Sequence, residues 1–394
     1  MPEALSRQAQ DPEEKVQGPG EAAAPARIAP RAQESGSSGL GARVLVLEAG
    51  SAAGNNLIRS LTAGDPSLVI VGCHESRFFL KKSPAQRNYL LPLSTADYGA
   101  ALRRIVRAER IDLVIPTSDA DVLRLARLRD KLWCRTLLPS TALIERCQDK
   151  YALTSFLRRR GIPAPLTYRI ADAKGVDAAF RRFKGHAKLW CRIRAGAGSL
   201  GAVPVRTPEQ VRGWIDYWEA MRAVPPGSFT LSEYLPGRDY CVQCLWDQGR
   251  LVLAKMAERI TYLNTGSPSG VSSMPALAKT VLYPHVIDVC TRAIQSLDPR
   301  SSGVLFVDLK ESERGEPCIT EINAGRFATM TNIHDLVGKH NMAATYVRLA
   351  MGEKVEIPGA VDFADGFYLV RSVDTLPAVV QEDQLFEGIG DVSV

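Results

Sequence analysis

The sequence of 394 residues has no long apolar run. Its longest apolar stretches, such as residues 44–47 and 68–71, have the length of strands, whereas a membrane-spanning helix needs about 20 apolar residues. The N-terminus has no basic segment followed by an apolar one, so the sequence predicts no secretory signal. Six acidic residues among the first 42 also argue against a transit peptide. We therefore expect a cytoplasmic protein without a membrane partner.

Basic clusters and metal-ligand spacings are also scarce. The formal net charge is +6, but the longest basic run is Arg158–Arg160, and aromatic residues do not alternate with basic ones. Nucleic acid is therefore not an expected partner, and small anions such as nucleotides fit the charge as well. The five histidines show no metal-ligand spacing, and Cys241 and Cys244 would point to opposite faces of a strand, so no zinc site is predicted. The eight scattered cysteines are expected to be reduced.

Residues 1–42 contain no aromatic residue but nine alanines and five prolines, and we expect a disordered tail. Such a composition buries too little apolar surface to offset the entropy lost on ordering. Residues 43–140 alternate between apolar strand runs and helical spacing, which predicts an α/β domain with a parallel sheet. The strands are expected at 44–47, 68–72 and 112–116, and the helices at 98–108 and 120–132.

Beyond residue 140 the pattern predicts an α+β body over 141–375, followed by a C-terminal extension over 376–394. Two helices are expected first, at 141–148 and 150–160, and Gly161 ends the second. The strands are expected at 188–193, 202–206, 229–234, 239–246, 250–257, 304–311, 317–322 and 366–373, and further helices at 208–220, 284–295 and 341–352.

Four clusters of residues in this body could carry chemistry. The first is Asp149-Lys150, where a lysine and backbone N–H groups at a helix start could meet phosphate oxygens, although a merely solvated lysine is the commoner case. The second is the loop of residues 192–201, whose glycines allow the backbone to approach a polyanion. This loop lacks the Gly-Lys-Ser/Thr ending of a P-loop, and a plain flexible hairpin is the alternative.

The third cluster is a Pro-Gly turn with Glu233 and Asp239 on either side, where an acid could accept hydrogen bonds from ribose hydroxyls. Two surface acids that merely flank a turn would give the same sequence pattern. The fourth cluster combines Asp308 with Glu321 and Asn323 on two strands that we expect to pair. Glu321 and Asn323 are two residues apart and share one face of a strand. Two carboxylates and an amide suit a Mg²⁺ ion that is shared with substrate phosphates.

Together, and in this order, the four clusters resemble the ATP-grasp superfamily, in particular the large chain of carbamoyl phosphate synthase and the carboxylate–amine ligases. The resemblance runs from about Arg43 to about Val373, and Gly303–Phe327 looks like the metal-binding hairpin of the family. It implies a Rossmann-like pre-ATP-grasp domain over 43–140, followed by an ATP-grasp fold with a mobile lid at about 187–231.

The resemblance also implies a role for each matching residue. Three residues are expected to be catalytic, with Lys150 and Arg192 on the ATP phosphates and Arg326 on the transferred phosphoryl group or acyl phosphate. The nucleotide would bind to the phosphate residues and loop, the adenine hinge and the ribose acid, which are Lys150, Arg192, Gly196, Gly198, Ser199, Gly201, Glu233, Tyr234, Leu235 and Asp239. Mg²⁺, with Mn²⁺ as an alternative, would be bound by Asp308, Glu321 and Asn323.

Two departures from the family pattern affect these expectations. Asp308 is shorter than the Glu or Gln of many relatives, and Asn323-Ala324-Gly325-Arg326 has one residue more than the common Asn-X-Arg. The second departure leaves the direction of the Arg326 side chain open.

The function implied is ATP-dependent ligation of a small carboxylate to an amine, or to a thiol, through an acyl phosphate, with release of ADP and phosphate. The resemblance also allows a homodimer. Phosphorylation of carbamate or bicarbonate, as in carbamoyl phosphate synthase, is one alternative, and a non-catalytic ATP-binding regulatory module is another. Dinucleotide binding is weaker, because Gly50–Gly54 lacks the Gly-X-Gly-X-X-Gly spacing.

Several residues outside these clusters are weaker candidates for substrate contacts. Arg259 and the small-residue segment Thr265–Ser273 could bind a second substrate or form only a connection. The remaining candidates are Ser51, Asn55 and Ser118 of the first domain, and His334 and His340, for which a structural role is the commoner case.

Overall fold

The computed structural model describes residues 41–93, 95–172, 175–196, 198–263, 274–372 and 378–384, all within one compact unit of residues 41–394. The tail expected over 1–42 lies outside the described residues except for its last two positions, and so does most of the extension expected over 376–394. No helix in the described ranges is long and apolar enough to cross a membrane.

The first part of the chain forms a parallel four-stranded sheet with the order β3-β2-β1-β4. The continuous apolar run Val44–Leu47 forms its interior, with β2 on one side and β4 on the other, as expected for a strand that is buried on both faces. Strand β3 was not predicted, because its sequence Arg-Asn-Tyr-Leu lies at an exposed edge and shows no apolar run. The elements are β1 (Arg43–Leu47), α1 (Ala52–Gly64), β2 (Val69–His74), α2 (Arg77–Leu80), β3 (Arg87–Leu90), α3 (Thr95–Ala108), β4 (Leu113–Ile115), α4 (Asp119–Leu128) and the 3-10 helix η1 (Arg129–Lys131).

Two helices, α5 (Thr141–Gln148) and α6 (Lys150–Arg159), follow where the sequence predicts them. Asp149 separates them and caps α6, because its carboxylate accepts hydrogen bonds from the backbone N–H groups of Tyr151 and Ala152. This cap fixes Lys150 as the first residue of α6, at the positive end of the helix dipole.

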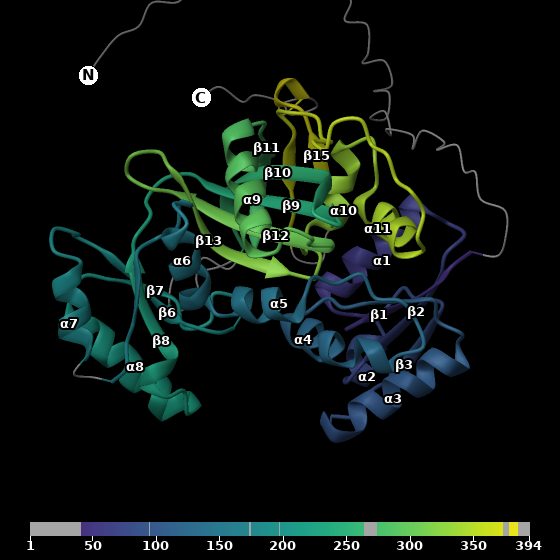
Figure 1. Ribbon diagram of the computed structural model, residues 1–394, viewed down its shortest axis with the longest axis horizontal. Coiled ribbons are helices and arrows are strands. Elements are labelled where there is room, and N and C mark those ends of the chain that lie inside the picture. The colour runs from purple at the N-terminus through teal and green to yellow at the C-terminus, as the bar shows by residue number, and fades with distance from the viewer. Residues whose placement is uncertain are drawn as a thin grey trace, which may run out of the picture. The chain divides into compact units, whose positions relative to one another are not determined.

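A second four-stranded sheet, with the order β5-β8-β6-β7, includes the segment expected to be the lid (Figure 1). It has its own apolar core, to which Ile170, Phe183, Leu189 and Phe229 belong. The sheet begins at β5, so it extends N-terminal to the expected range 187–231. Its elements are β5 (Thr167–Arg169), α7 (Gly175–Arg182), β6 (Leu189–Ile193), β7 (Val203–Val205), α8 (Pro208–Arg222), η2 (Pro226–Ser228) and β8 (Phe229–Glu233).

The remaining chain forms a seven-stranded antiparallel sheet with the order β13-β12-β9-β10-β11-β14-β15. The predicted pairing of β12 with β13 is confirmed, and Asp308 lies opposite Glu321. Strand β10 is longer than the expected 250–257, so Arg259 lies within a strand and not in a connection. The elements are β9 (Asp239–Asp247), β10 (Arg250–Tyr262), β11 (Pro275–Thr280), α9 (Pro284–Leu297), β12 (Gly303–Glu311), β13 (Pro317–Ala324), α10 (Thr331–His334), η3 (Asp335–Val337), α11 (Met342–Ala350), β14 (Tyr368–Val370), β15 (Ala378–Val380) and η4 (Glu382–Gln384).

Helices cover both faces of the large sheet. Helix α9 packs on one face of β9 and β12 (Figure 1), with Ile287 and Ile294 in the same core as Trp246. Helix α11 packs against β9 and also against α1 of the parallel sheet, so Tyr346 and Leu57 belong to one core. The two sheets therefore share buried apolar surface, which fixes the position of one relative to the other.

A buried ionic cluster adds a second link between these two parts. The ammonium of Lys255, whose side chain is 1% exposed, donates hydrogen bonds to Asp335 at 2.8 Å and to the carbonyl oxygens of His334 and His340 at 3.3 and 2.7 Å. The Asp335 carboxylate also accepts a hydrogen bond from Ser60 of α1. The cluster therefore ties β10 to the segment around α10 and to the parallel sheet.

Replacing Lys255 by Met is expected to lower the free energy of unfolding by about 3–5 kcal/mol, because Asp335 would remain buried without its cation. Urea denaturation followed by circular dichroism measures this loss. Lys354→Met is the control, since Lys354 is exposed and pairs only with exposed Glu356, and its effect should stay within about 0.5 kcal/mol. Equal effects of the two substitutions would contradict a structural role for Lys255.

Candidate functional site

A cavity of about 760 Å³ is lined by residues from all three sheets. The sheet of β5, β8, β6 and β7, called the lid sheet because it contains the expected lid, contributes Trp190. The large sheet contributes Asp308, and the segment after β4 of the parallel sheet contributes Ser118, the N-cap of α4. All of the predicted site residues line this cavity except Gly201, which is adjacent in the loop. The structure therefore brings together residues that are far apart in the sequence.

Strand periodicity explains why so many side chains meet here. Residues two apart on a strand point to the same face, and three strands turn such a series toward the cavity. The three series are Trp190 and Arg192 on β6 with Lys188 just before it, Phe306, Asp308 and Lys310 along β12, and Glu321 and Asn323 on β13. Trp190, Lys188, Phe306 and Lys310 were not predicted, although the same period-two rule applied to Arg192 and Asp308 could have found them.

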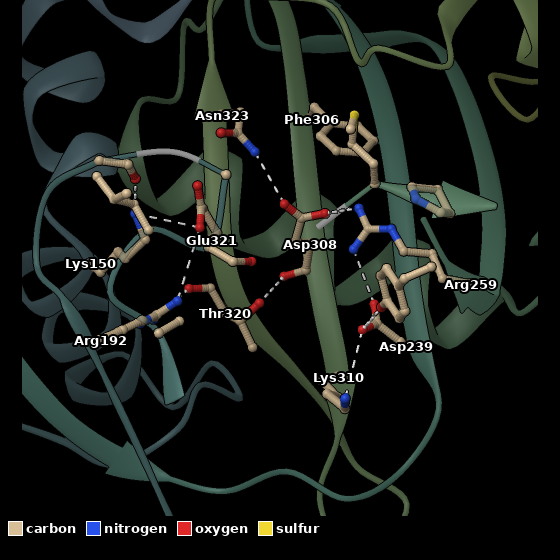
Figure 2. Close-up of a pocket in the computed structure, with 18 of the residues that line it drawn as sticks. Lys150, Arg192, Asp239, Arg259, Phe306, Asp308, Lys310, Thr320, Glu321 and Asn323 are labelled. Carbon is tan, nitrogen blue, oxygen red and sulfur yellow. Dashed lines mark hydrogen bonds and ion pairs between the residues drawn. The ribbon is translucent and has the colours of Figure 1, made fainter. Parts of the chain in front are cut away.

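Lys150 and Arg192 approach the same carboxylate, that of Glu321 (Figure 2). The Glu321 Oε2 atom lies 3.5 Å from the Lys150 Nζ and 4.0 Å from an Arg192 Nη. Both cations are buried, with 7% and 8% exposure. Burial lowers the pKa of each one, and the charge of Glu321 offsets this only in part. Two desolvated cations thus share one acid, and an anionic ligand would complete their charge balance.

A β-bulge next to Glu321 orients Arg192. Asp308 pairs with Glu321 but Leu309 pairs with Ile319, so Thr320 is the extra residue on β13. The Thr320 carbonyl oxygen is then available to Arg192, whose Nη2 donates to it at 3.0 Å.

The glycine-rich loop lies beside Lys150. Gly196, Gly198 and Ser199 line the cavity, and Ala197 lies outside the described residues. Positive φ angles of 139° at Gly196 and 70° at Gly198 favour glycine at these positions. The Lys150 ammonium donates to the Gly196 carbonyl oxygen at 2.5 Å, so the lysine and the loop form one wall.

The expected adenine hinge, Glu233 to Leu235, also lines the cavity. The Glu233 carboxylate accepts a hydrogen bond from the Leu166 backbone N–H at 2.7 Å, so its side chain is already engaged. The Tyr234 ring packs against Trp190, with ring centroids 6.2 Å apart, and lies 3.9 Å from the Lys188 ammonium. Apolar and aromatic surface therefore dominates this end of the cavity.

Asp239 and Asp308 both bind Arg259 (Figure 2). Burial acts to lower the pKa of Arg259, but the charges of Asp308 and Asp239 outweigh it and the pKa rises. Asp239 also accepts a hydrogen bond from the Tyr262 hydroxyl. Within the described ranges, no group of three or more His, Cys, Asp and Glu side chains could hold a metal ion. The predicted metal set thus depends on the amide of Asn323 and on acids that already have protein partners.

The extra residue in Asn323-Ala324-Gly325-Arg326 is accommodated by Gly325. Its φ of +91° and the approach of Val122 to within 2.9 Å of an added Cβ make glycine necessary. The chain turns there, and the Arg326 Nη2 donates back to the Asn323 side-chain oxygen. The Arg326 Nε also donates to Asp119 at 2.5 Å. Arg326 therefore points into the cavity.

Asp119 was not predicted as a site residue. It begins α4, with three residues between it and the end of β4, and Ser118 caps this helix. The signal that could have found it is its place at the carboxyl end of a parallel strand, where ligands bind in open α/β sheets. Arg326 and Asp119 form an ion pair that joins the large sheet to the parallel one.

The weaker candidates lie in different places. Ser118 lines the cavity, whereas Ser51 and Asn55 form local hydrogen bonds at the start of α1 and do not line it. His334 is buried outside the lining, and burial and neighbouring cations lower its pKa to about 3, so the imidazole is neutral. His340 does not line the cavity, and residues 264–273, which include the expected Thr265–Ser273 segment, lie outside the described residues.

Comparison with known proteins identifies the domain that contains this cavity. Residues 147–330 match the family described as "ATP-grasp domain". Residues 147–330 are therefore similar to ATP-grasp domains, and the expected resemblance to the ATP-grasp superfamily is confirmed. No sequence among the curated proteins matches this chain.

Solved structures support the same fold. The L-amino acid ligase from Bacillus licheniformis has a TM-score of 0.64 and 15% identity over 84% of this chain and 79% of its own. The biotin carboxylase domain dimer of 2-oxoglutarate carboxylase from Hydrogenobacter thermophilus, solved with MgADP, ADP and bicarbonate, has a TM-score of 0.64 and 15% identity over 84% and 74%. The N5-carboxyaminoimidazole synthetase from Staphylococcus aureus has a TM-score of 0.63 and 12% identity over 84% and 82%.

Arg192→Met is expected to weaken MgADP binding by about 10- to 100-fold, because charge-assisted hydrogen bonds of about 1.5–3 kcal/mol would be lost. Isothermal titration calorimetry measures the change. Arg206→Met is the matched control, since Arg206 is exposed just after β7 and does not line the cavity. Equal affinities for the two variants would contradict a role of Arg192 in phosphate binding.

Proposed function

We propose that this protein is an ATP-dependent ligase that joins a small carboxylate to an amine, through an acyl phosphate, with release of ADP and phosphate. The observation that carries the proposal is the pair of buried cations, Lys150 and Arg192, which share Glu321 beside a glycine-rich loop in an ATP-grasp domain. Such a pair binds a polyphosphate with little reorganisation. The neighbours with related folds are themselves a ligase, a carboxylase and a synthetase.

In this proposal ATP extends along the cavity. Its adenine would lie against the hinge residues Glu233 to Leu235 and the ring of Trp190, with the ribose at Asp239. Its phosphates would bind to Lys150, Arg192 and the N–H groups of the loop that contains Gly196, Gly198, Ser199 and Gly201. The cavity lining and the aromatic wall at Tyr234 support this direction.

Of the three predicted metal ligands, Glu321 is the one best placed to bind Mg²⁺. Glu321 is 22% exposed, and its two cationic neighbours lie at 3.5 and 4.0 Å, so an oxygen remains for a metal ion. Asp308 and Asn323 have closer protein partners. When bound, Mg²⁺ would offset the charge of the phosphate oxygens. One structural neighbour was solved with MgADP.

The reaction needs no nucleophilic side chain of the protein. A carboxylate does not react with an amine at neutral pH, because oxide would be the leaving group. Transfer of the γ-phosphoryl group to the carboxylate supplies phosphate as a better leaving group, which the amine then displaces. Arg326, oriented by Asp119 and Asn323, would stabilise the charge on the transferred group. Closure of the glycine loop would exclude water from the acyl phosphate.

We assign the carboxylate substrate to Arg371. This residue lines the cavity, and its Nη1 is a buried atom without a hydrogen-bond partner. Burial lowers the pKa of Arg371. No acid within the described part of the chain forms an ion pair with it, so a substrate carboxylate is a fitting partner. Thr117 and Ser118 line the cavity as well. Their hydroxyl groups donate to the Leu47 carbonyl oxygen and to Asp121, so they would meet a polar substrate as hydrogen-bond acceptors.

The cellular setting and the assembly remain proposals too. All eight cysteines are free, which supports the cytoplasmic location expected from the sequence. One structural neighbour is described as a dimer, which supports the proposal of a homodimer.

Incubation with Mg-ATP and pairs of amino acids is expected to release ADP and phosphate in equal amounts with a ligated product, measured by chromatography and mass spectrometry. Hydroxylamine should intercept the acyl phosphate as a hydroxamate. Phosphate release that depends on bicarbonate alone would favour the carbamoyl-phosphate-synthase-like alternative. ATP binding without turnover across the panel would favour a regulatory module, and AMP with pyrophosphate as products would contradict both enzyme proposals.

Arg371→Met is expected to raise the KM for the active carboxylate by about 10-fold or more, because a charge-assisted hydrogen bond is lost, and to leave MgADP affinity within about threefold. Arg371→Lys should restore part of the loss, because it retains the charge. Steady-state kinetics and calorimetry measure the two quantities. An unchanged KM in Arg371→Met would remove Arg371 from the substrate site.

A further inference from the structure

Arg259 lies between Asp239 and Asp308, and all three residues line the cavity (Figure 2). Its guanidinium donates through Nη1 to Asp239 at 3.1 Å and through Nη2 to Asp308. The side chain is 9% exposed, and each of the two acids is 18% exposed. A desolvated cation thus bridges the expected ribose acid and one of the expected metal ligands.

Strand pairing and packing fix this position. Arg259 lies directly opposite Asp239 in the register of β10 and β9, and Asp308 lies on β12, the other neighbour of β9. The guanidinium also lies 5.6 Å from the centroid of the Phe306 ring. Contacts from β9 and β12 thus hold the guanidinium that β10 carries.

The contacts of Arg259 engage part of the expected metal set. One Asp308 oxygen binds Arg259, and the other accepts a hydrogen bond from the Asn323 amide nitrogen at 3.1 Å. The Asn323 amide oxygen accepts from Arg326. Glu321 differs, because its cationic neighbours are 3.5 and 4.0 Å away. Glu321 is therefore suited to bind a divalent ion. Each carboxylate oxygen of Asp308 already accepts a hydrogen bond, so Asp308 is not suited to bind a second ion.

We propose that Arg259 is a built-in cation that takes the place of a second divalent ion, so that the nucleotide-loaded site binds one such ion, at Glu321. The inference rests on the proposed ATP site. A guanidinium at Asp308 neutralises that carboxylate and repels a divalent ion from it. Two of its five N–H donors bind the acids, and others remain for oxygens of the ligand.

Metal counting tests this inference directly. Full-length protein is dialysed to equilibrium against saturating ADP and increasing Mn²⁺, and bound Mn²⁺ and bound ADP are measured in the same chamber. The wild-type protein should bind one Mn²⁺ per ADP. Arg259→Met should bind two, because Asp308 becomes available, and Arg259→Lys should bind one, because the charge remains.

Asp308→Asn provides an independent variant of nearly the same shape. It should still bind one Mn²⁺ per ADP with a midpoint within threefold of the wild-type value, whereas Glu321→Gln should raise the midpoint at least tenfold. Arg206→Met, just after β7, is the control, and its Mn²⁺ count per ADP and its midpoint should equal those of the wild-type protein.

Two Mn²⁺ per ADP in the wild-type protein, or loss of the bound Mn²⁺ in Asp308→Asn, would overturn the inference and leave the proposed nucleotide site intact. Failure of the wild-type protein to bind ADP would instead overturn the proposed site, and this inference with it.

Discussion

Lys150, Arg192 and Glu321 form the interaction on which the cavity depends. Each residue comes from a different element, namely the start of α6, strand β6 of the lid sheet and strand β13 of the large sheet. The Glu321 carboxylate offsets only part of the cost of burying two cations, so the pair is suited to an anionic ligand. The Asp149 cap and the bulge at Thr320 keep the two cations aimed at the same point. The helix cap at Asp149 and the pairing of β12 with β13 thus hold the three charged groups close to one another.

The other ionic contacts extend this arrangement across the cavity. Arg326 binds Asp119 and thereby joins the large sheet to the carboxyl end of the parallel sheet, where Ser118 also lies. Arg259 joins Asp239, the acid expected to bind ribose, to Asp308. Arg371 differs from both, because it lines the cavity without an acidic partner in the described part of the chain. Paired and unpaired arginines thus divide the cavity into a region in which charges are balanced internally and a region suited to an anionic substrate.

Much of the fold could be predicted because local patterns are strong where strands are fully buried. Val44–Leu47 and the hairpin of β12 and β13 have continuous or alternating apolar residues, and each lies where the sequence indicates. Strands β3 and β5 could not be predicted, since each is short and lies at the edge of its sheet, where polar residues are tolerated. The full length of β10 was missed because the largely apolar run in its first part is followed by the charged residues Glu258 and Arg259.

The sequence by itself determined the order of the four clusters, the cap at Asp149, the glycines of the loop and the period-two series that carries Asp308 and Glu321. These features depend on backbone conformation and on neighbours within a few residues. Only the tertiary structure decided the partners of the charged groups: Arg259 with Asp239 and Asp308, Arg326 with Asp119, and Arg371 without an acid. Ion pairs between distant segments follow from sheet register and domain packing, and the spacing of residues along one chain contains no record of either.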